Sequence, residues 1–252
     1  MKISIITMSR KRPKYLLKSL ESFISKASNN KDIEYVSVID DDDMETKGYT
    51  KEINELAKKY NADIQTYETP RLPLEQYLNT GASVATGDVF FFIADDVFCE
   101  KEDWDLYMSD ACEKYLDEPF LIWTVGINES WKPHPTHFGI SKKWYEIANL
   151  ITCHRSSDEC VRDLALEANL RTIKLLDWYM HKQRHKKGTT HRILEGALEY
   201  DQVSFELANG YEGMKPSMSR KVDVGSNSNQ IGTKQLYEQA IEKLKNWRSY
   251  EK

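Results

Sequence analysis

Five consecutive apolar residues, VFFFI at positions 89–93, constrain the fold of this chain more than any other feature. A strand with one wet face alternates apolar and polar residues, whereas an unbroken apolar run fits a strand that is buried on both faces. The run begins after the turn residues Gly87 and Asp88 and ends just before Asp95-Asp96. We therefore predict a central parallel strand over residues 89–93, with two aspartates beyond its carboxyl end.

The residues before this run alternate between strand and helix patterns. We predict strands at Lys2–Thr7, Tyr35–Ile39 and Ile64–Tyr67, with an amphipathic helix after each of them. Such an alternation predicts a mostly parallel α/β sheet, doubly wound and flanked by helices. Ligands of these sheets bind at the carboxyl ends of the strands, so we expect the functional site there. The length of 252 residues fits one domain of this kind.

The second half of the chain has a weaker periodicity. It predicts a helix over residues 104–115, a strand at Phe120–Val125, a loop over Asn128–His137, a long helix over Asp158–Tyr179, a helix over Leu198–Ala208 and a C-terminal helix carrying Leu236, Ala240, Leu244 and Trp247. This half is therefore expected to add a helical C-terminal elaboration to the sheet.

Composition excludes several classes of protein. Hydrophobic residues make up 40% of the chain and the formal net charge is −5, so the chain as a whole is not a polyanion binder. No apolar run approaches the ~18 residues of a transmembrane helix, and the N-terminus lacks the apolar core of a signal peptide. We expect a cytoplasmic protein with reduced cysteines. Cys153, His154 and Cys160 have a poor spacing for a zinc site.

Acidic residues follow two of the predicted strands. Asp40–Asp43 follow the second strand and Asp95-Asp96 follow the apolar run, so both clusters are expected at one edge of the sheet. Mg2+ and Mn2+ prefer carboxylate oxygens, and Mg2+ binds through one or two of them together with phosphate. Asp95 and Asp96 suit that task, although paired aspartates can also cap a helix or solvate a turn. Asp40 or Asp41 is a candidate hydrogen-bond partner for a nucleoside, whereas the loop does not fit an EF-hand.

Five short motifs together resemble one enzyme family. They are Thr7-Met8-Ser9-Arg10-Lys11-Arg12-Pro13, Ile39-Asp40-Asp41, Asn79-Thr80-Gly81, Ala85-Thr86-Gly87-Asp88 and Ala94-Asp95-Asp96. In this order they resemble the family 2 glycosyltransferases, which have the Rossmann-like GT-A fold, and the resemblance covers residues 1–97. It implies a metal-dependent hexosyl- or pentosyltransferase that uses a nucleotide-sugar donor, with a UDP-sugar favoured, and Mn2+ or Mg2+ as cofactor.

The resemblance also implies roles for parts of the chain and for single residues. Residues 1–126 are expected to form the nucleotide-sugar-binding half of a single compact domain, and residues 127–252 the acceptor-binding half. The expected metal ligands are Asp95 and Asp96, and the expected donor-binding residues are Thr7, Ser9, Arg10, Asp40, Asp41, Arg71, Asn79 and Asp95.

Three positions depart from the family pattern. Ile93 replaces the first acid of the usual metal motif, which leaves two candidate carboxylate ligands. Leu78 replaces an arginine, whose positive charge Arg71 could supply instead. A further histidine that some relatives place on the metal is not evident near Val222–Asn229.

Inverting members of the family use one carboxylate as a general base, at the start of a late helix that is followed by Gly-Tyr. Tyr200-Asp201 before Gly210-Tyr211 matches this pattern. The resemblance therefore implies an inverting reaction with Asp201 as the base and Glu199 as the second choice. An acid at this position can instead simply stabilise a helix N-terminus.

The acceptor is the least constrained partner. His137 is a candidate for its pocket, although a solvated position is the more ordinary one for a loop histidine. The basic segment 181–192 follows Trp178 and carries Lys182, Arg184, Lys186 and Lys187, and it fits either a solvated helix end or a phosphate-binding surface. We expect a carbohydrate acceptor first, and second a hydroxymethylated DNA base of the kind that some bacteriophage relatives modify, with Trp178 stacking on the flipped base. The expected location is a bacterial or phage-infected cell.

Two other functions remain open from the sequence. A sugar-nucleotide nucleotidyltransferase would need a glycine-rich loop after the first strand, and Thr7–Pro13 contains no glycine. A non-catalytic nucleotide-sugar-binding module would keep the fold and lack the chemistry, and the missing acid at Ile93 is compatible with it.

Overall fold

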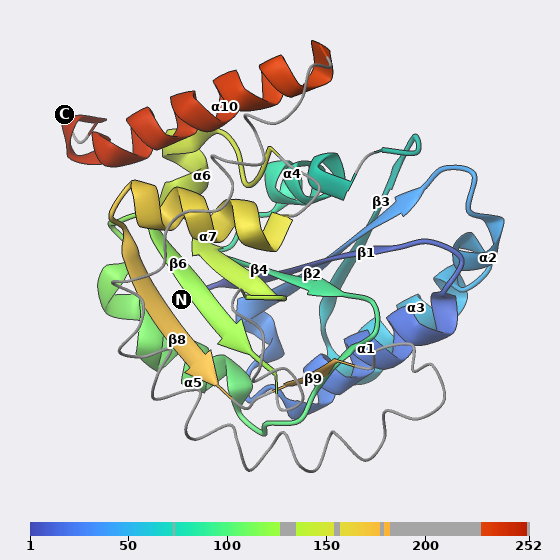
Figure 1. Cartoon of the computed structure of the whole chain (residues 1–252). Helices are drawn as coiled ribbons and strands as arrows, with labels where there is room; N and C mark the ends of the chain where they lie inside the picture. The colour runs from blue at the N-terminus through green and yellow to red at the C-terminus, as the bar shows by residue number, and fades with distance from the viewer. Residues whose placement is uncertain (73, 127–134, 154–156, 177–178, 182–227, 251–252) are drawn as a thin grey trace, which may run out of the picture.

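The computed structural model describes residues 1–72, 74–126, 135–153, 157–176, 179–181 and 228–250. Within these ranges the strands form a seven-stranded sheet in the order β3-β2-β1-β4-β7-β6-β8 and a two-stranded sheet of β5 and β9 (Figure 1). Helices cover both faces of the large sheet. The predicted α/β architecture is confirmed.

The first four strands of the large sheet are parallel. β1 (Ile3–Ser9) lies between β2 (Ile33–Asp40) and β4 (Val89–Ala94), and β3 (Asp63–Thr69) pairs with β2. The register sets Ile39 beside Ser9 and Thr7 beside Ile93, so β1, β2 and β4 end at one edge. The two acidic clusters therefore share that edge, as the sequence predicts.

The remaining three strands make the sheet mixed. β7 (Phe138–Ser141) is antiparallel to β4 and to β6 (Phe120–Val125), while β8 (Arg171–Leu176) is parallel to β6. The sheet is thus mostly parallel, with β7 reversed next to its central strand β4. This reversal joins the two halves of the chain in one continuous sheet.

The apolar run of β4 is buried on both faces, as predicted. Its five side chains are between 0% and 2% exposed. Phe90 and Phe92 belong to one hydrophobic cluster of the core, and Val89, Phe91 and Ile93 belong to the other. The unbroken apolar pattern arises because β4 separates these two clusters.

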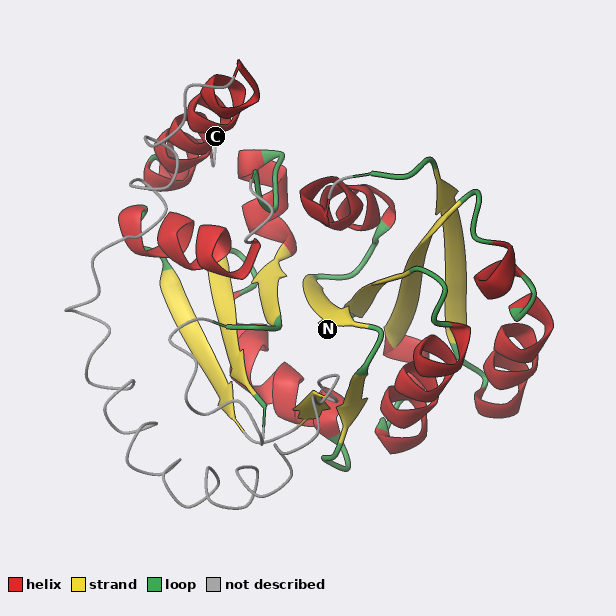
Figure 2. Cartoon of the chain, turned by 45° about the vertical axis from the view of Figure 1, so that its right-hand side comes forward, coloured by secondary structure: helices red, strands yellow, loops and turns green. Residues whose placement is uncertain are grey.

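The helices form one layer on each face of the sheet. The layer of α1 (Pro13–Lys26), α3 (Thr50–Tyr60) and α5 (Trp104–Cys112) packs against the cluster that contains Phe91. The opposite layer consists of α4 (Leu74–Val84), α6 (Lys142–Ala148), α7 (Ser157–Glu167) and α10 (Ser228–Lys245) (Figure 2). None of the helices in the described ranges is long and apolar enough to cross a bilayer.

Gly81 explains how α4 approaches the sheet so closely. A Cβ atom at this position would lie 2.4 Å from Cγ2 of Ile6 on β1. Real side chains do not approach that closely, so a larger residue would push α4 away from β1. The close approach places the N-terminal half of α4 beside the carboxyl end of β2.

The predicted helix over Asp158–Tyr179 is wrong beyond its first half. α7 ends at Glu167, and Asn169 follows in the left-handed conformation with a φ of 54°. Such a residue terminates a helix, and the amide of Leu170 closes the turn by donating to the carbonyl of Ala165 at 2.9 Å. The chain then forms β8 instead.

A short antiparallel pair lies directly after the second acidic cluster. β5 (Val97–Cys99) pairs with β9 (Tyr179–His181), and the register sets His181 beside Val97. The predicted C-terminal helix is confirmed as α10, which buries Tyr237, Ala240 and Leu244, while Leu236 is 49% exposed. The predicted helix over Leu198–Ala208 lies outside the described residues.

Candidate functional site

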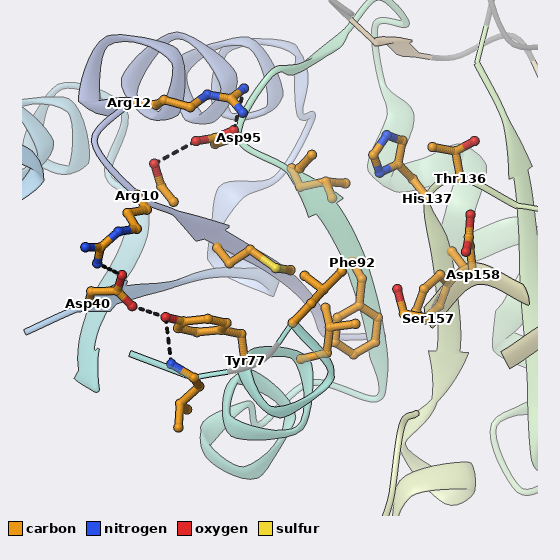
Figure 3. A pocket seen from close by; sticks show the side chains of 18 of the residues that line it. Arg10, Arg12, Asp40, Tyr77, Phe92, Asp95, Thr136, His137, Ser157 and Asp158 are labelled. Carbon is orange, nitrogen blue, oxygen red and sulfur yellow. Dashed lines mark hydrogen bonds and ion pairs between the residues drawn. The ribbon is translucent and has the colours of Figure 1, made fainter. Parts of the chain in front are cut away.

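A pocket of about 790 Å³ opens at the carboxyl ends of β1, β2 and β4. One wall includes residues from these strand ends, the loop after β1 and the start of α4, and Thr136, His137, Ser157 and Asp158 lie on the opposite wall (Figure 3). This volume lies in the range of sites for small organic ligands, ~300–1,000 Å³. The pocket therefore sits where a sheet of this topology is expected to bind its ligand.

The loop between β1 and α1 is fixed to the acidic residues around it. Lys11 has a φ of 53° and donates its backbone amide to Oδ2 of Asp43 at 2.7 Å. Asp43 also accepts the amide of Thr46 at 3.1 Å and so caps the short helix α2 (Met44–Lys47). Burial alone would raise the pKa of Asp43, but the hydrogen bonds from Thr46 and Lys11 lower it. Asp43 is thus a structural anchor for this loop.

Asp40 is the acid of the first cluster that faces the pocket. It is 1% exposed at the end of β2, where its carboxylate accepts hydrogen bonds from Arg10 and from the phenol of Tyr77. Arg10 also contacts Asp42 at 2.6 Å, and this hydrogen bond lowers the pKa of Asp42. Asp41 is exposed, does not line the pocket, and uses its amide to extend the pairing with β3.

Asp95 and Asp96 converge on a single nitrogen of Arg12. Nη2 of Arg12 lies 2.8 Å from Oδ1 of Asp95 and 2.6 Å from Oδ2 of Asp96. Ser9 donates a further hydrogen bond to Oδ2 of Asp95 at 2.7 Å. The two aspartates are only 3% and 6% exposed, and burial raises the pKa of Asp95. A positive charge is therefore already held between the two carboxylates.

The same carboxylates fit a hard divalent cation. Their oxygens reach one point from two directions, and Mg2+ and Mn2+ prefer such oxygens. In the described part of the chain no group of three or more His, Cys, Asp or Glu side chains could hold a metal. A cation between Asp95 and Asp96 would therefore take further ligands from a bound phosphate or from water.

Three more predicted donor residues lie at the pocket, and two do not. Ser9, Arg10 and Arg71 line it. Thr7 is buried in β1 and does not line the pocket. Asn79 also lies outside the lining, where its side chain accepts the amide of Ile151 at 2.7 Å and donates to the carbonyl of Thr152 at 2.9 Å. Asn79 thus ties α4 to the segment before α7.

His137, in the second half of the chain, lines the pocket. It is 5% exposed, and its carbonyl accepts a hydrogen bond from Thr124 of β6. The alternative that this histidine is a solvated loop residue is wrong, because His137 directly precedes β7 and is enclosed beside the central strand. Its lining position is compatible with contact to an acceptor.

Asp158 is a pocket residue for which the sequence patterns predict no functional role. It lies in the first turn of α7 and, with Ser157, lines the pocket across from Asp40 (Figure 3). The available signal was an acid at a helix start behind a polar loop, which is common in helices that have no function. The register also brings His181 next to β5, and the sequence pattern alone did not reveal that proximity.

Several residues with predicted roles lie outside the described part of the chain. They are the candidate bases Glu199 and Asp201, His154 of the unfavoured zinc set, and the acceptor-side candidates Trp178, Lys182, Arg184, Lys186 and Lys187. The roles proposed for them from the sequence stay predictions.

Comparison with protein families gives one match. A family model described as "Glycosyl transferase family 2" matches residues 4–161, which is more than half of the chain. No curated protein matches the chain in sequence.

Solved structures share the fold at low identity. TarS of S. aureus is 16% identical with a TM-score of 0.54, over 95% of this chain and 49% of TarS, so the chain spans about half the length of that protein. The mannosyltransferase PcManGT from Pyrobaculum calidifontis, in complex with GDP-Man and Mn2+, is 12% identical with a TM-score of 0.56, over 98% and 87%. Glucosyl-3-phosphoglycerate synthase from Mycobacterium tuberculosis, in complex with Mn2+, UDP and glucosyl-3-phosphoglycerate, is 11% identical with a TM-score of 0.51, over 86% and 81%.

Proposed function

Because the chain belongs to glycosyl transferase family 2 and has the GT-A fold of a glycosyltransferase, we propose that its pocket binds a nucleoside-diphosphate sugar and a divalent cation. The observation that carries this proposal is the pairing of Arg10 with Asp40 and of Arg12 with Asp95 from one short loop. Through these two arginines, that loop connects two separate acidic positions on the same edge of the pocket.

The two acidic positions bind different parts of the donor. Asp40, held by Tyr77, provides a buried acceptor for the polar edge of the nucleoside. Asp95 and Asp96 provide the oxygens for Mn2+ or Mg2+. When bound, the cation would neutralise the charge that develops on the leaving diphosphate. Structures with this fold that hold UDP or GDP-Man support a nucleotide ligand, and we favour a UDP-sugar.

The acceptor side requires a group that removes a proton. In an inverting transfer the acceptor oxygen forms a bond to the anomeric carbon, the bond to the diphosphate breaks, and the hydroxyl proton passes to a base. Asp158 is a carboxylate on the wall opposite the donor side, which suits attack from the opposite face of the sugar. We therefore place Asp158 first as the base, ahead of Asp201 and Glu199.

The nature of the acceptor follows from the remaining wall. Phe92, Phe138 and His137 contribute aromatic rings to the lining of the pocket, and Thr136 and Ser157 contribute hydroxyl groups. Aromatic rings and short polar side chains suit the faces and hydroxyls of a carbohydrate. We propose a carbohydrate hydroxyl as the acceptor, and a hydroxymethylated DNA base is the alternative that an added DNA substrate would reveal.

Binding calorimetry tests the donor assignment without turnover. A panel of UDP- and GDP-sugars is titrated into the protein with and without Mn2+, and then into Asp40→Asn. We expect at least one donor to bind with a micromolar dissociation constant, and this binding should require Mn2+. In Asp40→Asn the affinity for that donor should fall by about tenfold or more. Binding of none of the donors would contradict the assignment of this pocket.

A further inference from the structure

Arg12 occupies the position at which a divalent cation would bind the two aspartates. Its Nη2 atom contacts Oδ1 of Asp95 and Oδ2 of Asp96 at 2.8 and 2.6 Å. Two adjacent buried carboxylates repel each other unless a cation lies close to both. In the structure this cation is a side chain of the protein itself.

Arg12 and a metal ion cannot share these oxygens. A small divalent cation binds carboxylate oxygens at about 2 Å. It would then lie within a few ångströms of a guanidinium that contacts the same atoms, and two such cations repel strongly at that distance. Metal binding between Asp95 and Asp96 therefore requires the Arg12 side chain to move.

The surroundings of Arg12 allow its side chain to leave while the loop stays. The side chain is 26% exposed, and its guanidinium carbon lies 5.2 Å from the centre of the Tyr15 ring. Among the described residues, the buried Nε of Arg12 has no hydrogen-bond partner. The backbone is held separately, by the amide of Lys11 on Asp43 and by the start of α1 at Pro13.

We propose that Arg12 is a positioning residue that exchanges with the divalent cation. Before the donor binds, Arg12 keeps Asp95 and Asp96 together, and when the metal arrives Arg12 turns to the diphosphate. A guanidinium forms paired hydrogen bonds with phosphate, and Arg12 already lines the pocket. This exchange rests on the proposed function of the pocket, since it assumes that a metal and a diphosphate bind there.

Binding of Mn2+ to the nucleotide-free protein tests the exchange independently of catalysis. In the wild type Mn2+ has to displace Arg12. The apparent affinity for Mn2+ is therefore reduced in proportion to the fraction of protein in which Arg12 has left the site. Arg12→Gln should therefore bind Mn2+ about tenfold more tightly, as measured by calorimetry or by electron paramagnetic resonance of the free ion. With Mn2+ saturating, the same variant should bind UDP about tenfold more weakly.

Two further variants keep the test decisive. Lys14→Gln removes an exposed positive charge from the first turn of α1 and should match the wild type in Mn2+ affinity. Arg12→Met keeps an apolar stem against Tyr15, and it should behave like Arg12→Gln if that variant folds poorly.

Each outcome separates the exchange from the function on which it rests. Unchanged or weaker Mn2+ binding in folded Arg12 variants overturns the exchange alone. Absence of Mn2+ binding in the wild type and in both variants, even with UDP present, overturns the exchange together with the metal assignment. Tighter binding of Mn2+ and weaker binding of UDP in both variants support the exchange.

Discussion

The phenol of Tyr77 on α4 donates a hydrogen bond to the buried carboxylate of Asp40 at the end of β2. The same phenol oxygen accepts the backbone amide of Leu72 at 3.0 Å. Tyr77 thus connects the strand end, the helix and the segment between β3 and α4, and it orients the acid that we assign to the nucleoside.

Removal of this hydroxyl should weaken donor binding while the fold persists. Tyr77→Phe leaves Asp40 with Arg10 but loses one hydrogen bond to a charged group, so we expect binding of the nucleotide sugar to fall about tenfold. The control is Tyr67→Phe, which removes a phenol that contacts Gln65 on β3. Calorimetry that finds equal losses in both variants would contradict a specific role for Tyr77.

Asp95 should be required for metal-dependent activity. Asp95→Asn keeps the shape of the side chain but removes a charged oxygen ligand, so the Mn2+ concentration for half-maximal activity should rise by about tenfold or more. Asp63→Asn, at an exposed position on β3, should leave the Mn2+ dependence unchanged. An activation curve of Asp95→Asn that overlays the wild-type curve would argue against Asp95 as a ligand.

Replacement of the proposed base should reduce kcat but leave the affinity for the nucleotide sugar unchanged. Asp158→Asn should lower kcat about 100-fold or more, because general-base catalysis contributes about that much, while binding of the nucleotide sugar stays within twofold. Asp201→Asn tests the competing assignment, and Asp110→Asn, at an exposed position on α5, is the control. A large loss of kcat in Asp201→Asn with little effect in Asp158→Asn would restore Asp201 as the base.

Glu34 should make the stability of the fold depend on pH. This carboxylate is 1% exposed at the start of β2 and accepts hydrogen bonds from Ser4 and from the amide and hydroxyl of Thr86. Burial acts to raise its pKa, but the hydrogen bonds outweigh burial and lower the pKa to about 2, from an unfolded value near 4.5.

The sign of this effect follows from the lowered pKa. The stabilisation is fully present above about pH 4.5 and is lost as pH falls toward about 2, with a total of about 3 kcal/mol. Urea unfolding at pH 7 and pH 3 should show a smaller fall in the free energy of unfolding for Glu34→Gln than for the wild type. Glu52→Gln, exposed on α3, should keep the full fall, and a fall of wild-type size in Glu34→Gln would contradict the assignment.

The fold of the first half could be predicted because local patterns there agree with the tertiary structure. The run at 89–93 is buried by layers on both faces, so its composition reports its place directly. In the second half of the chain, helical spacing continues through Asn169 and predicts a helix where the structure has β8. The left-handed turn at that residue redirected the chain into β8, and the pairing of β8 with β6 is a long-range contact that no local pattern records.

The site could be predicted only in part, for a similar reason. Asp40 directly follows one predicted strand, and Asp95 lies just beyond the predicted strand over residues 89–93. The parallel topology alone therefore brings both aspartates to one edge of the sheet. Asp158 reaches the pocket because α7 packs on the opposite half of the sheet. The side chain of Asn79 does not line the pocket, because it forms hydrogen bonds with the backbone of residues 151 and 152. Such placements depend on how layers pack, which a single sequence does not specify.

Release of nucleoside diphosphate from a nucleotide sugar tests the central claim most directly. The purified protein is incubated with Mn2+, a panel of UDP- and GDP-sugars and carbohydrate acceptors, with hydroxymethylated DNA as a separate arm. The account predicts release of nucleoside diphosphate that requires an acceptor, stops with a chelator and falls sharply in Asp95→Asn. Release of pyrophosphate instead, or no release from any donor with either acceptor class, would contradict it.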